Sequence, residues 1–327
     1  TSLVEIVPDR GIGRFDLNPH QASPLSAFLS LGDLQRAVEQ QGHINSLLLD
    51  RRDDSGTDPL PLLATALSLA DFGIELRSIE GPANAELIEI ESQEFVLRPA
   101  LVETIEATAR DLQAPVQRLQ AYMSNGLHLD GRQVPYSMVL AADVVGGADG
   151  SMPFGRLELL DGTTAPRLAA DEILLNEWTA TELDASAGDE LRMSYYVVGI
   201  DEQLHTEEAL FRVAGTVAMR GLAVDADLTP DYPGIEGVDN IADWEPPFPV
   251  DLNSIRDVDE EYWDAYRGTP KSFVAADTGR RLWSTRYGAT TSVRVAGPVN
   301  SDVTTFTSEL GSMLLEQLDP SDYGFRF

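Results

Sequence analysis

The residues of this chain that could do catalytic chemistry are scattered rather than grouped into a known motif. The histidines occur singly, without the HExxH or His-x3-His spacing of zinc sites, at His20, His43, His128 and His205. The sequence contains no GxSxG nucleophile elbow, no phosphate-binding GxxxxGK loop and no kinase motifs. It contains no cysteine, which excludes thiolate metal sites and cysteine nucleophiles. We therefore expect a protein that binds or transmits motion rather than an enzyme.

Acidic residues provide one spacing that suggests a metal. Asp225, Asp227 and Asp231 form a DxDxxxD pattern in an expected loop, which resembles part of a calcium-binding loop. The pattern lacks the glycine and the terminal glutamate of an EF-hand, so solvated loop acids are the favoured interpretation. These three aspartates are weak metal candidates, and we expect no cofactor in this domain.

Aromatic residues and prolines are concentrated between Trp244 and Arg294, which indicates a rigid and specifically packed element. The side chains of this stretch that could contact a substrate or partner are Trp244, Pro247, Phe248, Tyr262, Trp263, Lys271, Trp283 and Arg286. The simpler interpretation is structural. It places the aromatic rings in the core and pairs Lys271 and Arg286 with acids such as Asp259 or Glu260.

The charge balance limits the partners of the chain. Its 327 residues include 23 Lys and Arg against 54 Asp and Glu, a net charge of −31. Such a surface repels phosphate backbones and anionic lipid headgroups, so we expect no nucleic acid as a partner. No apolar run approaches the roughly 20 residues that cross a bilayer. The chain begins with Thr1 and shows no signal peptide, so we expect a trimmed or mature fragment of a longer protein.

Helices and strands alternate at both ends of the chain, and strands dominate the middle. Near the start, Ser30 should cap a helix with Asp33 in its first turn, and Gly42 should end it, between strands at 27–29 and 44–49. Further strands are expected at 74–79, 87–90, 95–97, 116–129, 134–145, 191–198 and 211–219, with helices at 99–112 and around Trp178. The end should contain strands at 272–276, 292–295 and 323–327 and a helix capped by Ser301.

This order of elements predicts an α+β fold with two lobes. One lobe is a mixed α/β unit built from both chain ends, residues 1–115 together with 256–327. The other is an inserted β-rich lobe, residues 116–255.

Several stretches resemble the extracytoplasmic domain of large FtsX-like, MacB-type ABC-transporter permeases. The most specific are LTPDYPGIEGVDNIADWEPPFPVDL, DEEYWDAYRGTPKSFV and GRRLWSTRYGATTSVR. AYMSNGLHLDGRQVPYSMV is similar to a central motif of the family, and LLNEWTATELDASAGDELRMSYYVV followed by FRVAGTVAM is similar to a more general one.

The resemblance implies a domain on the outer, periplasmic face of the bacterial inner membrane, held by flanking membrane helices. It implies a porter-like lobe made from both chain ends, a cytoplasmic ABC ATPase that uses ATP, and a second permease subunit or half. The domain would couple the motion of the membrane helices to export or extraction of a substrate, with no catalytic residues of its own. The residues leave two alternatives open, an exported acidic hydrolase of glycans or esters and a calcium-dependent adhesion module.

Overall fold

The chain forms two compact units, Thr1–Pro59 and Leu60–Phe327, and each is described by itself. A computed structural model describes residues 5–8, 10–14, 26–38, 40–46, 65–82, 85–143, 153–199, 203–230, 232, 234–235, 238, 240–241, 244, 248–298 and 302–325. Within these residues, no helix combines the length and the apolar character that a membrane crossing requires.

The first unit contains a 3-10 turn, η1 (Gly11–Arg14), and helix α1 (Leu31–Ala37). The backbone N–H of Asp33 donates to the Ser30 hydroxyl at 3.3 Å, which confirms the predicted cap. The helix ends at Val38, so the prediction that Gly42 ends it is wrong. The strands expected at 27–29 and 44–46 are absent from these described residues, and positions 47–49 lie outside them.

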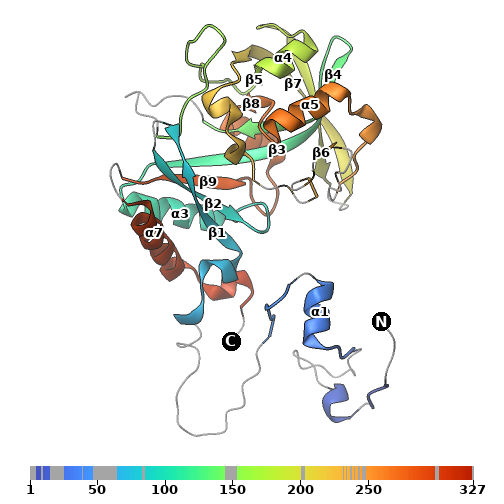
Figure 1. The fold of residues 1–327 in the computed structure, drawn as a ribbon, viewed down its shortest axis with the longest axis vertical. Helices are drawn as coiled ribbons and strands as arrows, with labels where there is room; N and C mark the ends of the chain where they lie inside the picture. Colours follow the sequence, from blue (N-terminus) through green and yellow to red (C-terminus); the bar gives the residue numbers. More distant parts are fainter. Residues whose placement is uncertain are drawn as a thin grey trace. The chain divides into compact units, whose positions relative to one another are not determined.

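The second unit is a mixed sheet of nine described strands in the order β1-β2-β9-β3-β4-β8-β5-β7-β6, with helices packed on it (Figure 1). The strands are β1 (Ile74–Glu80), β2 (Glu86–Ser92), β3 (Val116–Leu129), β4 (Arg132–Ala141), β5 (Glu172–Asn176), β6 (Glu190–Val198), β7 (Leu204–Val217), β8 (Ser272–Val274) and β9 (Ser292–Ala296). The helices are α3 (Pro99–Asp111), α4 (Glu177–Leu183), α5 (Asp257–Tyr266), α6 (Ala276–Trp283) and α7 (Val303–Gln317). Short 3-10 turns are η2 (Leu69–Phe72), η4 (Gly221–Val224), η5 (Ala226–Leu228), η7 (Leu252–Ser254) and η8 (Pro320–Tyr323).

The first sheet consists of β1, β2, β9 and the beginning of β3, all paired antiparallel. Helices α3 and α7 lie beside it in Figure 1, and their apolar faces join one core with the strands. That core includes Ile105 of α3, Leu310 of α7 and Val293 of β9, each fully buried. Segments far apart in the sequence, 72–116 and 293–325, thus share one hydrophobic cluster.

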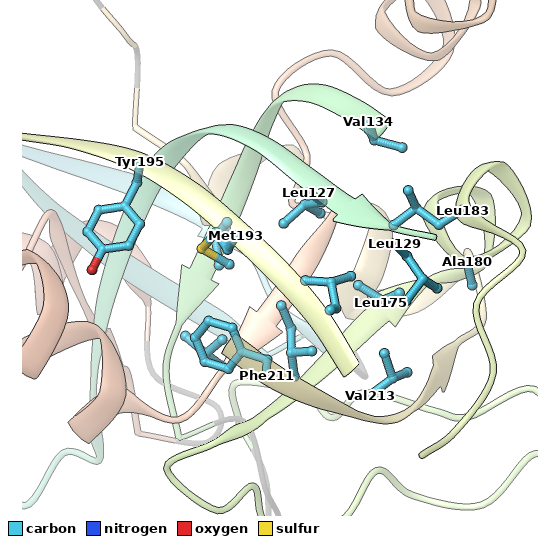
Figure 2. Packing of buried hydrophobic residues seen from close by; sticks show 14 of the residues in the cluster. Leu127, Leu129, Val134, Leu175, Ala180, Leu183, Met193, Tyr195, Phe211 and Val213 are labelled. Carbon is cyan, nitrogen blue, oxygen red and sulfur yellow. The ribbon is translucent and has the colours of Figure 1, made fainter. Parts of the chain in front are cut away.

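The remaining strands close into a barrel, because β6 pairs with β3 as well as with β7. Pairings β4–β8 and β5–β7 are parallel, and the others are antiparallel. Figure 2 shows the interior, where Leu127, Leu175, Met193 and Phe211 from four different strands point toward one another. Each of these side chains is at most 2% exposed, so the barrel is a packed core.

Strand β3 belongs to both parts of the sheet. Its residues 116–119 pair with β9 in the first sheet, and residues 120–129 pair with β4 in the barrel. The turn to β4 has positive φ at Asp130 (46°) and Gly131 (81°), as a tight hairpin turn requires. A bulge between Ser124 and Gly126 shifts the pairing with β6. One continuous strand therefore connects the two parts.

The α+β fold class is confirmed, and so are most predicted elements of the second unit. Strand β5 and helix α6 were not predicted. Gly279 discourages a helix in sequence, but here it lets α6 approach β4, where an added Cβ would lie 2.2 Å from Ala141 Cβ. The predicted division into 1–115 with 256–327 and 116–255 stays a prediction, while β8 pairs with the barrel strands β4 and β5.

Three further predictions about helix and strand positions are wrong. Asp302, not Ser301, caps α7, because its carboxylate accepts a hydrogen bond from the backbone N–H of Thr305 at 3.0 Å. Residues 95–97 contribute only one bridge, Leu97 to Thr290, since Phe95 has φ of 67° and turns the chain. Tyr323 lies in the 3-10 turn η8 that begins at Pro320, and the described residues beyond it, 324–325, form no strand.

Buried charges connect the first sheet to η5, the turn that follows η4. Arg294 on β9 is 1% exposed and donates to Glu89 on β2 at 3.3 Å and to Asp225 at 2.9 Å. Arg77 on β1 donates to Glu89 at 3.1 Å and to Asp227 at 2.6 Å. We call these five residues the charge chain. Leu228 of η5 packs with the outer surface of the barrel, so the charge chain joins both parts of the unit.

The charge chain predicts an unusual pH dependence. Burial raises the pKa of Glu89 from 4.5 to about 7, although Arg294 and Arg77 oppose this shift. The folded state therefore keeps a proton that the unfolded chain releases, so the contribution of Glu89 to stability is lost as the pH rises from 4.5 through about 7. The difference in unfolding free energy between wild type and Glu89→Gln should fall by on the order of 3 kcal/mol over that range. Urea unfolding at a series of pH values measures it, and a difference that grows with pH would contradict the raised pKa.

Candidate functional site

Most of the predicted contact residues meet around helix α5 and the start of β8. The helix begins after Arg256, whose backbone N–H donates to the Asp259 carboxylate at 2.9 Å. Three acids lie in its first turn, where the helix dipole favours them. The helix buries Tyr262 and Trp263, and Lys271 follows just before β8. The site is therefore built from one capped helix and the strand next to it.

An aromatic cavity lies between α5 and the strands β3 and β4. The rings of Trp244 and Trp263 meet edge to face with centroids 5.1 Å apart, and they pack with Met123 and Met138. The cavity has a volume of about 30 Å³. Its described lining is Met123, Pro135, Tyr136, Met138, Thr229, Pro230, Tyr232, Ile235, Ile241, Trp244, Ile255, Asp259, Tyr262, Trp263, Arg267, Gly268, Thr269 and Lys271. A space of this size holds about one or two water-sized groups.

Tyr262 fixes one wall of the aromatic cavity. Its hydroxyl accepts a hydrogen bond from Asn176 Nδ2 at 3.0 Å and lies 2.9 Å from Thr269 Oγ1. Burial raises the pKa of Tyr262, so the phenol stays neutral. Asn176 also caps α4 through the backbone N–H of Thr179, at 2.8 Å. One amide side chain therefore holds α4, α5 and the loop before β8 in a fixed arrangement.

Lys271 is buried against aromatic rings. The side chain is 6% exposed, and Nζ lies 4.8 Å from the ring centroid of Trp178 and 4.9 Å from that of Tyr262. Its backbone N–H donates to Met138, and its carbonyl accepts from Asn176, so β4 and β5 position it. Among the described residues, no carboxylate or carbonyl accepts a hydrogen bond from Nζ. The two rings stabilise the cation by cation–π interaction instead.

The acid nearest to this lysine already has a partner. Asp259, 1% exposed, accepts hydrogen bonds from Arg256 Nε at 2.8 Å and Nη2 at 2.9 Å. Arg256 also donates to Glu182 of α4 at 3.0 Å. Charge-assisted bonds of this kind hold a carboxylate firmly. The structural interpretation that paired Lys271 with Asp259 is wrong, because Arg256 takes that place.

Phe248, another predicted contact residue, lies close to the aromatic cavity. The ring of Phe248 is half-buried, with centroids 6.1 Å from Tyr232 and 6.5 Å from Tyr196. Pro247 lies outside the described residues. Glu260 of α5 accepts a hydrogen bond from the backbone N–H of Ile241 at 3.0 Å. This bond fixes Ile241, which lines the cavity, to the helix.

Two predicted contact residues lie elsewhere. Trp283 on α6 packs with the interior cluster of the barrel and stacks on Tyr122, with centroids 4.8 Å apart and planes at 6°. Arg286 is exposed and donates to the hydroxyl of Tyr287 at 2.7 Å. Its predicted pairing with Asp259 or Glu260 is therefore wrong. The spacing along the chain did not reveal that α6 turns away from the aromatic cavity.

The weak calcium candidates are engaged by arginines. Asp225 pairs with Arg294 and Asp227 with Arg77, at 2.9 and 2.6 Å, while Asp231 lies outside the described residues. In the described ranges, no cluster of three or more acids or histidines is placed to hold a metal ion. The carboxylates of the charge chain therefore serve as ion-pair partners in this structure.

The sequence analysis missed one signal at this site. Lys271 is the single lysine of the chain, whose other 22 basic residues are arginines. Lysine and arginine differ in size, shape and hydrogen-bonding geometry, so a lone buried lysine among arginines was a feature to single out. The cap Asn176 and the ion pairs of Arg256 gave no comparable signal in the sequence.

No protein-family model matches the chain, and no curated protein matches its sequence. The fold is similar to that of the periplasmic region of MacB from Actinobacillus actinomycetemcomitans, with a TM-score of 0.35 and 10% identity over 70% of this chain and 75% of that one. It is also similar to a domain from Porphyromonas gingivalis described as part of a permease protein, with a TM-score of 0.37 and 12% identity over 75% and 80% of the two chains. Scores this low establish neither a family nor a function.

Burial of Trp263 predicts a large effect on stability. Because the ring is 5% exposed and packs with Trp244, Trp263→Ala should lower the free energy of unfolding by about 3–5 kcal/mol. Tyr287→Ala is the control, since its ring is 60% exposed, and it should change stability by less than about 0.5 kcal/mol. Equal effects of the two substitutions in urea unfolding would show that Trp263 is not part of the core.

Lys271 predicts a second pH dependence, of opposite sign to that of Glu89. Burial lowers the pKa of Lys271 from 10.5 to about 8, although Asp259 favours the charged form. The unfolded chain therefore binds the proton more tightly, and stability should rise as the pH increases from about 8 to 10.5. Relative to Lys271→Met, the unfolding free energy of the wild type should rise by on the order of 3 kcal/mol over that range. A constant difference between the two proteins would show that the amine stays solvated.

Proposed function

We propose that this chain is a non-catalytic extracytoplasmic domain of an ABC-transporter permease. It couples the ATP-driven motion of membrane helices to export or extraction of a substrate. The resemblance of its Trp- and Pro-rich motifs to the FtsX-like, MacB-type permeases supports this assignment. ATP would be used by a cytoplasmic ABC ATPase, and a second permease subunit or half would complete the transporter.

The observation that carries the coupling role is the continuity of β3. A domain that transmits motion needs a connection that does not bend between the part that is driven and the part that acts. Strand β3 is 14 residues long and is hydrogen-bonded to β9 at its start and to β4 along the rest. Separating the first sheet from the barrel along this strand would break backbone hydrogen bonds to β9 or to β4, each of which is costly to leave unmade.

The charge chain provides a second connection beside the strand. Asp225, which caps η5, and Asp227 within it pair with Arg294 and Arg77 on the first sheet, so a displacement of that sheet would also pull on the turn. The turn packs on the outside of the barrel through Leu228, which is fully buried. Two independent connections would limit rotation between the sheet and the barrel as well as separation.

The hydrolase alternative has one described pair to test. Ser194 Oγ lies 3.1 Å from His128 Nε2, and burial lowers the pKa of His128. A hydrolytic site also needs a group that orients the histidine and donors for an oxyanion. The interactions described for His128 include no carboxylate hydrogen bond. If the purified chain hydrolysed a glycan or ester, and Ser194→Ala abolished the activity, the assignment as a non-catalytic domain would fail.

The coupling role predicts a variant that separates ATP hydrolysis from transport. Asp225→Asn with Asp227→Asn keeps the shape of η5 but removes two charges of the charge chain. In the parent permease, purified from native membranes with the ATPase that accompanies it, this variant should transport several-fold less substrate per ATP. The control is Asp184→Asn, because Asp184 pairs with Arg132 on the surface, where the side chains are 77% and 53% exposed.

Two outcomes would count against the proposal. One is purification of the parent protein from membranes without any ABC ATPase. The other is unchanged transport per ATP in the double variant while its unfolding free energy falls, since the charge chain would then stabilise the fold without transmitting motion.

A further inference from the structure

We propose that the aromatic cavity is a binding site for a small monocarboxylate, held by Lys271 and Trp244. Binding of such a ligand would be independent of the transporter assignment. The site is indicated by a mismatch between hydrogen-bond donors and acceptors in a buried place.

Two residues that line the aromatic cavity, Trp244 and Lys271, carry donors that have no hydrogen-bond acceptor among the described residues. The indole Nε1 of Trp244 is buried without a hydrogen-bond partner, and the Trp244 side chain is only 7% exposed. Lys271 Nζ contacts the rings of Trp178 and Tyr262 but donates to no oxygen among the described residues. A buried donor that remains unpaired is destabilising, so an oxygen that accepts from the Trp244 indole would favour ligand binding. The same ligand would give Lys271 Nζ an acceptor.

The local charge favours an anion although the chain as a whole is acidic. Among the described residues of the lining, the charged ones are Lys271, Arg267 and Asp259. Asp259 accepts its charge-assisted hydrogen bonds from Arg256, so this carboxylate does not pair with Lys271. The net charge of −31 repels anions at long range, which disfavours ligands with several charges. A single carboxylate meets both conditions.

The walls of the aromatic cavity favour an apolar body behind that carboxylate. Met123, Met138, Ile235 and Ile241 line it together with the ring of Trp263. The cavity volume of about 30 Å³ accepts a group of a few atoms. A short-chain carboxylate such as butyrate combines a group of that size with an alkyl chain that these apolar side chains would contact.

The single lysine agrees with this assignment. A guanidinium is larger and planar and always charged, whereas an ammonium group is a compact point charge that fits between two rings. Packing Nζ against Trp178 and Tyr262 leaves its remaining N–H bonds available for an oxygen in the cavity. Arg267, at 5.6 Å from the ring centroid of Trp263, lies at the side of the same cavity.

The test is a titration of the purified chain with sodium butyrate at constant ionic strength, followed by calorimetry. Saturable binding is expected for butyrate and not for 1-butanol or butylamine, which carry the same alkyl chain without the anion. Lys271→Met should weaken binding about tenfold or more, and Trp244→Phe about fivefold, since charged hydrogen bonds contribute more than neutral ones. Trp283→Phe is the matched control, because Trp283 Nε1 is also buried without a partner but lies outside the cavity. Its affinity should equal that of the wild type.

A measurement on the wild type covers the case in which a variant fails to fold. The four tryptophans give four indole N–H signals in a nitrogen–proton correlation spectrum. Butyrate should shift the Trp244 signal strongly and leave that of Trp283 in place. The proposal is overturned if no indole signal shifts, if butanol binds as well as butyrate, or if a folded Lys271→Met protein binds with unchanged affinity.

Discussion

The second unit depends on one constraint: β3 must form backbone hydrogen bonds with both the first sheet and the barrel. Its first residues complete the pairing of β9, and its later residues close the barrel with β4 and β6. Neither part can shift along β3 without breaking backbone hydrogen bonds in the other. The charge chain then closes a second connection, with Arg294 buried between Glu89 and Asp225. Buried ion pairs contribute less to stability than to specificity, because desolvation offsets much of their attraction. Here they fix η5 to the first sheet, and that placement supports the proposed role in transmitting motion.

Much of the fold could be predicted because its pattern is local. The hairpin of β3 and β4 follows from two apolar-rich runs around Asp130 and Gly131, and α3 follows from an apolar stripe after a proline. Strand β5 was missed because it is a short, almost wholly buried run beside a helix, which periodicity does not distinguish. The closure of the barrel was not predictable either. It rests on pairing between β3 and β6, whose residues 128 and 192 lie far apart in the sequence.

The candidate site was predictable only where it depends on local sequence composition. Large aromatic residues next to prolines are expected in a packed region, and Trp244, Tyr262 and Trp263 are indeed buried together. Trp283 is equally buried but belongs to the barrel interior, because α6 packs on a different surface. The environment of Lys271 follows from tertiary contacts alone, since Arg256 takes the acid that the sequence offered to it. The single lysine of this acidic chain is instead buried against the rings of Trp178 and Tyr262.

Native-state hydrogen exchange measures the central claim most directly, namely that β3 makes the first sheet and the barrel one mechanical unit. Amides of β2 and β9 in the first sheet should open with the same free energy, and the same dependence on denaturant, as amides of β5 and β7 in the barrel. That result would show that the two parts unfold together. Exchange of the first sheet at a clearly lower free energy, while the barrel amides stay protected, would show that β3 does not couple them and would contradict the account.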